Sequence, residues 1–97
     1  MRIDLCLSRL CLYKTRSQAG KACDEGLVEW NGQRARPSRE VHPGDRVLFR
    51  DRLGRWLTEV EILGLPERPV SKASARELYR ILRHEKIDSP WPEEAGA

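Results

Sequence analysis

The side chains best suited to binding phosphate gather in one short stretch, Lys14-Thr15-Arg16-Ser17. Thr15, followed three residues later by Gln18, is a capping box that predicts a helix start. The unpaired N–H groups of a helix start bind anions, and the two cations and two hydroxyls of this stretch add further donors. Lys21 lies one helical turn beyond Ser17 and extends the same surface. These residue types at this spacing predict a phosphate site.

The helix that we place over residues 15–25 should end at Gly26, a typical C′ residue. Its charges lie at the unfavourable ends. A helix start is electropositive and a helix end is electronegative. Basic residues nevertheless lie at the start, whereas Asp24 and Glu25 lie at the end. Each misplaced charge costs up to about 1 kcal/mol in the free protein. A bound phosphate would relieve the cost at the start, whereas simple solvation of Lys14 and Arg16 leaves both reversed ends unexplained.

A second basic segment follows in Asn31-Gly32-Gln33-Arg34-Ala35-Arg36. Asn-Gly is the strongest short signal for a tight hairpin turn. Arg34 and Arg36 are two residues apart, so they share one face of the returning strand, and Arg39 follows them. The planar fork of arginine can bind two phosphate oxygens together. We therefore add this hairpin to the predicted anion-binding surface.

The charge distribution favours a polyanionic partner. Of the 97 residues, 34% are charged, and the net charge is +3. Residues 1–50 hold ten Lys and Arg against six Asp and Glu, whereas residues 51–97 hold eight against nine. The positive field therefore belongs to the N-terminal half.

Because no apolar run approaches the ~20 residues that span a bilayer, and no signal peptide is evident, we expect a cytoplasmic protein without a membrane partner.

The sequence gives little support for catalysis or metal binding. Cys6, Cys11 and Cys23 lack the paired spacing of a zinc site, and His42 and His84 lie in no ligand pattern. We expect the cysteines to be buried as small hydrophobes in a reducing compartment. Phosphate-loop, nucleophile-elbow and zinc-hydrolase motifs are missing from the sequence. We therefore expect no metal, no cofactor, no small-molecule substrate and no enzymatic activity.

Hydrophobic periodicity predicts an α+β fold in one unit. A third, C-terminal helix should start at the capping box Ser74/Glu77 and use Leu78, Ile81 and Leu82 as its apolar face. The expected elements are helices over 3–12 and 15–25, strands over 27–30, 33–36, 46–50 and 56–63, and this third helix. The expected organisation is a binding domain with an extended sheet over 1–64, a loop and helix packed on it over 65–88, and a flexible tail over 89–97.

The third helix would carry a rival basic patch. Arg76, Arg80 and Arg83 fall at i, i+4 and i+7, opposite the apolar face. Glu77 and Glu85 dilute this patch, and basic residues in such positions are usually only the solvated side of a helix. Its role in binding stays open.

Five motifs in the first half of the chain resemble the S-four RNA-binding domain, named after ribosomal small-subunit protein four. They are Arg2-Ile3-Asp4, Lys14-Thr15-Arg16-Ser17, Gly26-Leu27-Val28, Asn31-Gly32 and Val41-His42-Pro43-Gly44-Asp45. Within that superfamily, residues 13–17 and 31–41 are most similar to the branch of the fifteen-kilodalton heat-shock protein and its short relative in ribosome-associated quality control. The chain ends in DSPWPEEAGA rather than in a basic extension, so the shorter relatives are the better model.

The resemblance implies an α-L motif, in which two N-terminal helices and a small antiparallel sheet present one RNA-binding surface. It also implies binding of ribosomal RNA and tRNA on the free large ribosomal subunit, where a stalled peptidyl-tRNA is still attached. The motifs and the basic segments together give the predicted RNA-binding residues, which are Arg2, Arg9, Lys14, Thr15, Arg16, Ser17, Lys21, Asn31, Gly32, Gln33, Arg34 and Arg36.

Three other functions stay open at this stage. The first two helices could form a helix-turn-helix of a DNA-binding regulator, although the second lacks an exposed series for reading base edges. The chain could also target a separate RNA-modifying enzyme, because it is too short to hold a catalytic domain of that kind. A structural ribosomal protein is the third. The size of the chain and the lack of an evident apolar patch favour a monomer.

Overall fold

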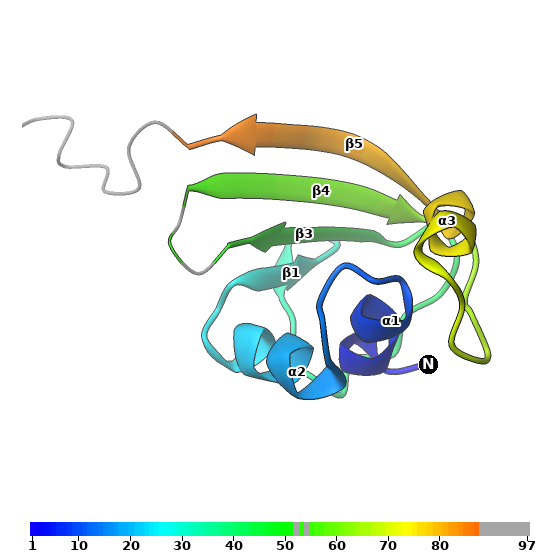
Figure 1. The fold of residues 1–97 in the computed structure, drawn as a ribbon. Coiled ribbons are helices and arrows are strands. Elements are labelled where there is room, and N and C mark those ends of the chain that lie inside the picture. Colours follow the sequence, from blue (N-terminus) through cyan, green and yellow to red (C-terminus); the bar gives the residue numbers. More distant parts are fainter. Residues whose placement is uncertain (52, 54, 88–97) are drawn as a thin grey trace, which may run out of the picture.

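The structure is a computed structural model that describes residues 1–51, 53 and 55–87. Two short helices, α1 (Ile3–Arg9) and α2 (Arg16–Asp24), lie against one side of a curved antiparallel sheet (Figure 1). A third helix, α3 (Lys72–Ala75), follows the fourth strand and continues as a short 3-10 helix over Arg76–Leu78. The predicted α+β class is confirmed.

The sheet has five strands in the order β2-β1-β3-β4-β5, and every neighbouring pair is antiparallel. The strands are β1 (Val28–Trp30), β2 (Gln33–Arg34), β3 (Arg46–Arg50), β4 (Trp56–Ile62) and β5 (Tyr79–Lys86). Asn31 and Gly32 join β1 to β2 with φ angles of 46° and 84°. Two consecutive positive φ angles define the type I′ hairpin turn that the Asn-Gly pair predicts.

Helix α2 has both of its predicted ends. The hydroxyl oxygen of Thr15 accepts a hydrogen bond from the N–H of Gln18 at 3.1 Å. Gly26 takes a φ of 79° just beyond the other end, and the N–H groups of residues 26 and 27 bond to carbonyls of the last turn. This is a Schellman ending, which glycine adopts without strain.

Helix α1 ends three residues earlier than the sequence predicts. Cys11 has a φ of 61°, and its N–H donates to the carbonyl of Ser8 at 3.0 Å. The N–H of Leu12 donates to the carbonyl of Leu7, also at 3.0 Å, so the helix closes on a Schellman motif without glycine. Cys11 is therefore exposed, and the prediction that all three cysteines are buried is wrong for this one.

One hydrophobic core lies between the two helices and the sheet. The apolar sides of α1 and α2 face β1, β3 and β4, so their polar sides point outward. The side chains with 2% exposure or less are Ile3, Cys6, Leu7, Leu10, Ala19, Ala22, Cys23, Val28, Ala35, Val41, Val47, Val60 and Ile62. Burial of each large aliphatic side chain stabilises the fold by about 1.5–3 kcal/mol. This packing fixes the outer sides of the helices relative to the β1–β2 hairpin.

The prediction of a C-terminal helix is wrong for most of its length, because the residues after Leu78 form a strand. Ser71, rather than Ser74, caps α3, and the helical part ends at Leu78. Strand β5 follows and pairs with β4 from Ile62↔Tyr79 to Trp56↔Lys86, with a bulge between Glu59 and Val60. The face expected from Leu78, Ile81 and Leu82 therefore does not exist, because two of the three lie on an exposed strand.

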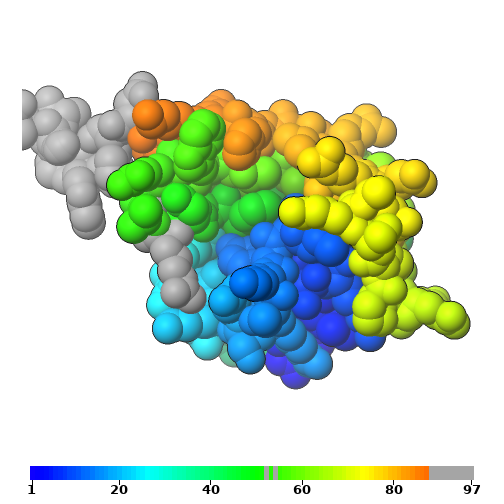
Figure 2. Space-filling view, viewed as in Figure 1, coloured from blue at the N-terminus to red at the C-terminus, as the bar shows by residue number. Residues whose placement is uncertain are grey.

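Residues 65–78 close the flank of α1, where the space-filling view shows them in yellow beside the blue helix (Figure 2). Leu65 and Leu78 pack against the core from this segment. The predicted tail over 89–97 lies outside the described residues. Among the residues that the structure does describe, no helix has the length and apolar character needed to cross a membrane.

Candidate nucleic-acid interface

A buried carboxylate holds two of the predicted arginines at the junction of α1 and α2. Oδ2 of Asp4 lies 3.1 Å from Nη2 of Arg2 and 3.5 Å from Nε of Arg16, while Oδ1 accepts the N–H of Leu5 at 2.7 Å. The side chain of Asp4 is only 8% exposed, whereas those of Arg2 and Arg16 are 48% and 49% exposed. The carboxylate thus fixes one side of each guanidinium and leaves the rest open to a ligand.

Helix α2 approaches this carboxylate at Gly20. A Cβ added at Gly20 would lie 3.9 Å from Cβ and Oδ2 of Asp4 and from Cβ of Pro37. These are ordinary van der Waals distances, so only a side chain longer than that of alanine at Gly20 would press on Asp4 or Pro37. Three segments that are distant in the sequence meet here, namely the start of α1, the middle of α2 and the loop after β2.

The start of α2 presents the other predicted donors. Lys14, Thr15 and Ser17 are exposed there, and Lys21 is exposed in the last turn of the same helix. The Thr15 oxygen is used as the helix cap, but its hydroxyl proton stays available to a ligand. With Arg2 and Arg16, which meet at Asp4, these residues include four cations on the helical pair, and we call the set the helix-start surface.

The acidic end of α2 has a basic partner from the hairpin. Nη2 of Arg34 donates to the backbone carbonyl of Asp24, and the guanidinium of Arg34 also lies 3.6 Å from the position that a Cβ on Gly26 would occupy. A cation at a helix C-terminus interacts favourably with the macrodipole and with the unpaired carbonyls. Arg34 is therefore part of the fold as well as an exposed candidate for phosphate contact.

The Asn31-Gly32 turn is held by a carboxylate from the loop before β3. Asp45 accepts hydrogen bonds from the Trp30 indole at 2.8 Å, from the Asn31 amide at 3.2 Å and from the N–H of His42 at 2.9 Å. The oxygen of the Asn31 side chain accepts the N–H of Arg46 at 2.8 Å. Both polar ends of Asn31 are thus engaged within the protein, which gives this predicted contact residue a structural role.

These contacts also shift the acidity of Asp45. Partial burial alone would raise its pKa, but the hydrogen bonds from His42, Trp30 and Asn31 favour the charged form more strongly. The pKa of Asp45 is therefore held below its ordinary value of 3.8. At neutral pH the carboxylate is ionised and keeps the hairpin in place.

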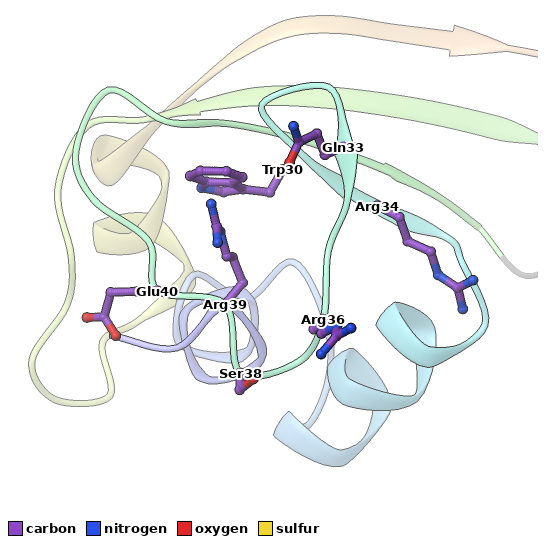
Figure 3. A pocket seen from close by; sticks show the side chains of 7 residues that line it. All are labelled: Trp30, Gln33, Arg34, Arg36, Ser38, Arg39 and Glu40. Carbon is purple, nitrogen blue, oxygen red and sulfur yellow. The ribbon is translucent and has the colours of Figure 1, made fainter.

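The hairpin and the loop after it enclose a basic hollow, shown in Figure 3. Its volume is about 360 Å³. It is lined by Trp30, Gln33, Arg34, Arg36, Ser38, Arg39 and Glu40. The guanidinium carbon of Arg39 lies 3.5 Å from the centroid of the Trp30 ring. Glu40 is paired with the N-terminal ammonium, so the three arginines dominate the charge of the hollow.

The predicted set lacks four residues that line this hollow, Trp30, Ser38, Arg39 and Glu40, and Trp30 and Arg39 are the two that stack on each other. An aromatic residue next to a run of arginines is the signal that points to them, but the stacking depends on how the loop 35–40 folds back. That loop is fixed to the start of α1, because the N–H of Ile3 donates to the carbonyl of Arg39 at 2.7 Å. The loop that lines the hollow is therefore joined to the start of α1, next to Arg2.

One predicted residue lies apart from both surfaces. Nη1 of Arg9 donates to the backbone carbonyl of Pro66 at 3.1 Å. Arg9 thus fastens the segment after β4 to the side of α1, where it is partly buried. The structure does not bring it together with the other predicted contact residues.

The basic patch expected from Arg76, Arg80 and Arg83 does not form, because two of these residues lie in strand β5. Nε of Arg83 lies 3.7 Å from Oε1 of Glu59, and Nε of Arg80 lies 4.0 Å from Oε1 of Glu61. Both arginines therefore face carboxylates of β4 across the sheet instead of forming a helical row. Arg76 lies in the 3-10 helix before the strand. The helical spacing predicted for these three residues is wrong.

Groups suited to a metal ion are also lacking in the described ranges 1–51, 53 and 55–87, where no three His, Cys, Asp or Glu side chains converge. Burial raises the pKa of Cys6 to about 11, and burial together with Asp4 and Asp24 raises that of Cys23 to about 11. These two thiols are protonated core residues. The exposed arginines, lysines and hydroxyls of the site can make several hydrogen bonds to an anion.

A protein-family model and a solved structure both match this chain. The model of the S4 domain matches residues 1–47, which contain both helices, the β1–β2 hairpin and the Asp45 carboxylate. The chain is 33% identical to the heat shock protein 15 of Vibrio cholerae, whose structure is described as trimeric. The two folds superpose with a TM-score of 0.76 over 84% of this chain and 80% of the other.

Two curated relatives define the branch more closely. The RQC P-site tRNA stabilizing factor of Bacillus subtilis is 34% identical over 87 residues, which are 90% of this chain and 98% of the relative. A heat shock protein 15 homolog of Aeromonas salmonicida is 37% identical over 79 residues, which are 81% of this chain and 58% of the relative. The chain belongs to the S4-domain family, in the group that contains these stabilizing factors and the heat shock protein 15 homologs.

Proposed function

We propose that this protein binds RNA without catalysing a reaction. Its partners are ribosomal RNA and tRNA on the free large ribosomal subunit, and it acts in the cytoplasm in the rescue or quality control of stalled nascent chains. The observation that carries the proposal is the pair Arg2 and Arg16, each held by the buried Asp4 and each about half exposed. Residues 1–64 form the binding domain.

The arrangement suits the phosphates of a folded RNA. The helix-start surface and the basic hollow present cations and hydroxyls over several elements, and none of the helices in the described part of the chain projects a row of base-reading side chains. Such a surface recognises the shape and backbone of RNA more than its base sequence. Because each phosphate contact releases counterions, the affinity should fall steeply as the salt concentration rises.

The relatives support the ribosomal assignment. The name of the Bacillus subtilis relative specifies stabilisation of the P-site tRNA, and the match covers nearly the whole of both chains. This supports tRNA as one partner, and we propose the large subunit as the place where the protein meets it. We propose that the protein acts as a monomer, in contrast with the trimeric description of the Vibrio cholerae structure.

Co-sedimentation with separated ribosomal subunits tests the proposal. The wild-type protein should travel with the large subunit, and Lys14→Glu, at an exposed position outside the Asp4 pair, should reduce this at least tenfold. Arg16→Glu should abolish it. Arg76→Glu makes the same charge reversal on the distant 3-10 helix and should bind as the wild type does.

Thermal unfolding of each variant shows whether the fold is kept. Wild-type co-sedimentation of a folded Arg16→Glu protein would contradict the assignment of this surface. Binding to duplex DNA that survives excess structured RNA would favour a DNA-binding regulator. Co-purification with an RNA-modifying enzyme, without binding to the large subunit, would favour a targeting subunit.

A further inference from the structure

The Trp30 indole is held in place by the protein, and the exposed side chain of Arg39 covers one face of its ring. The ring is partly buried and packs against the core, and its N–H donates to Asp45 at 2.8 Å. These contacts fix the position of the ring at the edge of the basic hollow. The guanidinium of Arg39 lies over the ring at 3.5 Å, and Arg39 is itself exposed. Figure 3 shows the end of the Arg39 side chain next to the Trp30 ring.

We propose that the face of Trp30 covered by Arg39 is a stacking site for one unpaired RNA base. The base displaces Arg39 from the ring, and Arg36 and Arg39 then bind the phosphates on either side of that nucleotide. The inference deepens the proposed function and rests on it, because it names a subsite of the same RNA-binding surface. The hollow of about 360 Å³ has room for a nucleotide.

The exchange is favourable on general grounds. A cation over an exposed aromatic ring contributes about two- to fivefold in an equilibrium constant, whereas stacking of a base on such a ring contributes about five- to 150-fold. The displaced Arg39 gains a new interaction, because a phosphate of the bound nucleotide is a charged hydrogen-bond partner for its guanidinium. Arg39 therefore shields the apolar ring of Trp30 from water in the free protein and is displaced when a base binds.

The other groups of the hollow suit a nucleotide. Gln33 and Ser38 supply an amide and a hydroxyl that can bond to the edge of a base or to a ribose hydroxyl. Glu40 is engaged by the N-terminal ammonium, so its charge is offset within the protein. Arg34 is directed toward the end of α2, where it bonds to the Asp24 carbonyl, and it adds positive charge from that side.

Tryptophan fluorescence gives a direct test. The chain has three tryptophans, and the double variant Trp56→Phe/Trp91→Phe leaves Trp30 as the reporter. Hexa-adenylate should quench this fluorescence to saturation, because the base stacks on the ring. Inorganic polyphosphate offers the same charges without bases, so it should compete for the arginines without producing that quenching.

Substitutions at Trp30 separate stacking from charge. Trp30→Leu should weaken binding of hexa-adenylate about tenfold and leave that of polyphosphate unchanged, whereas Trp30→Phe, which keeps an aromatic face, should stay within about threefold of the wild type. Arg36→Glu should weaken both ligands. If Trp30→Leu fails to fold, the quenching in the reporter variant decides the matter.

Each outcome bears on one proposal. If the wild-type protein travels with the large subunit but hexa-adenylate leaves the fluorescence of Trp30 unchanged, the stacking site is wrong and the ribosomal function stands. If hexa-adenylate quenches Trp30 but the protein does not travel with either subunit, the stacking site stands and the ribosomal function is wrong. Equal quenching by polyphosphate would overturn the stacking site, because it would show that loss of the Arg39 cover alone gives the signal.

Discussion

Nε of Arg16 lies 3.5 Å from Oδ2 of Asp4, so the first residue of α2 is paired with a carboxylate in the first turn of α1. Across the same helix, Arg34 donates to the carbonyl of Asp24. The two ends whose charges are unfavourable for α2 alone are thus each compensated by a neighbouring element. Arg16 is only half covered by its partner, which leaves it able to bind phosphate as well.

Removing the cation at the end of α2 should cost stability. We expect Arg34→Ala to lower the free energy of unfolding by about 1 kcal/mol, because it takes a charged donor from the last carbonyls of the helix. Urea unfolding measures this effect. Arg36→Ala is the matched control, since Arg36 is exposed and its guanidinium makes no hydrogen bond or ion pair with the described residues. It should change the free energy by less than about 0.5 kcal/mol. Equal losses in the two variants would contradict the role of Arg34.

The hairpin should lose stability in acid through Asp45. The pKa of Asp45 is lower in the folded protein than its ordinary value of 3.8. A lowered pKa contributes stability above the unfolded value, and this contribution is lost as the pH falls from about 3.8 through the folded pKa. Asp45→Asn should therefore unfold more easily at pH 7 and show a shallower fall in stability below pH 4. If the free energy of unfolding fell equally steeply below pH 4 in the two proteins, the role of this carboxylate would be contradicted.

The cysteines should differ in reactivity. Burial raises the pKa values of Cys6 and Cys23 to about 11, whereas Cys11 is exposed in the left-handed ending of α1. At pH 8 a thiol reagent should label one cysteine quickly in the native protein and the other two only on unfolding. Mass spectrometry of proteolytic fragments identifies the site, and Cys11→Ser removes the fast phase. Rapid labelling of Cys23 would show that the core is open there.

Local signals were sufficient for α2 and for the β1–β2 hairpin. Thr15 as a cap, Gly26 beyond the helix end and Asn31-Gly32 at the turn each act within a few residues of the chain. The structure places all of these where the sequence predicts them. A feature whose geometry is decided by neighbours in sequence can be predicted without knowledge of the remaining fold.

Strand β5 shows where local signals fail. Leu78, Ile81 and Leu82 have helical spacing, but pairing with β4 decides the conformation of residues 79–86. Ile81 and Leu82 are 57% and 40% exposed, so they contribute little to the core, and their spacing carries no information about it. The energetic gain comes from backbone hydrogen bonds to a partner strand more than fifteen residues away, which periodicity does not report.

The contacts that shape the site were equally beyond local signals. The charges of Arg2, Arg16 and Arg34 were predicted to matter, but not the carboxylate and carbonyl that orient them. Those partners depend on how closely α1 and α2 pack and on where the hairpin meets the helix end. The stacking of Arg39 on Trp30 likewise requires the loop to be fastened to the start of α1.

The most direct test of this surface is the RNA affinity of Asp4→Asn at constant salt. The substitution removes a negative charge from a basic surface, so attraction to RNA through net charge alone would make binding tighter. It also releases Arg2 and Arg16 from the carboxylate that orients them. We expect binding to the large ribosomal subunit to weaken several-fold, with a loss of about 1 kcal/mol in stability. Tighter binding by a folded Asp4→Asn protein would contradict the claim that a buried carboxylate arranges these arginines for RNA.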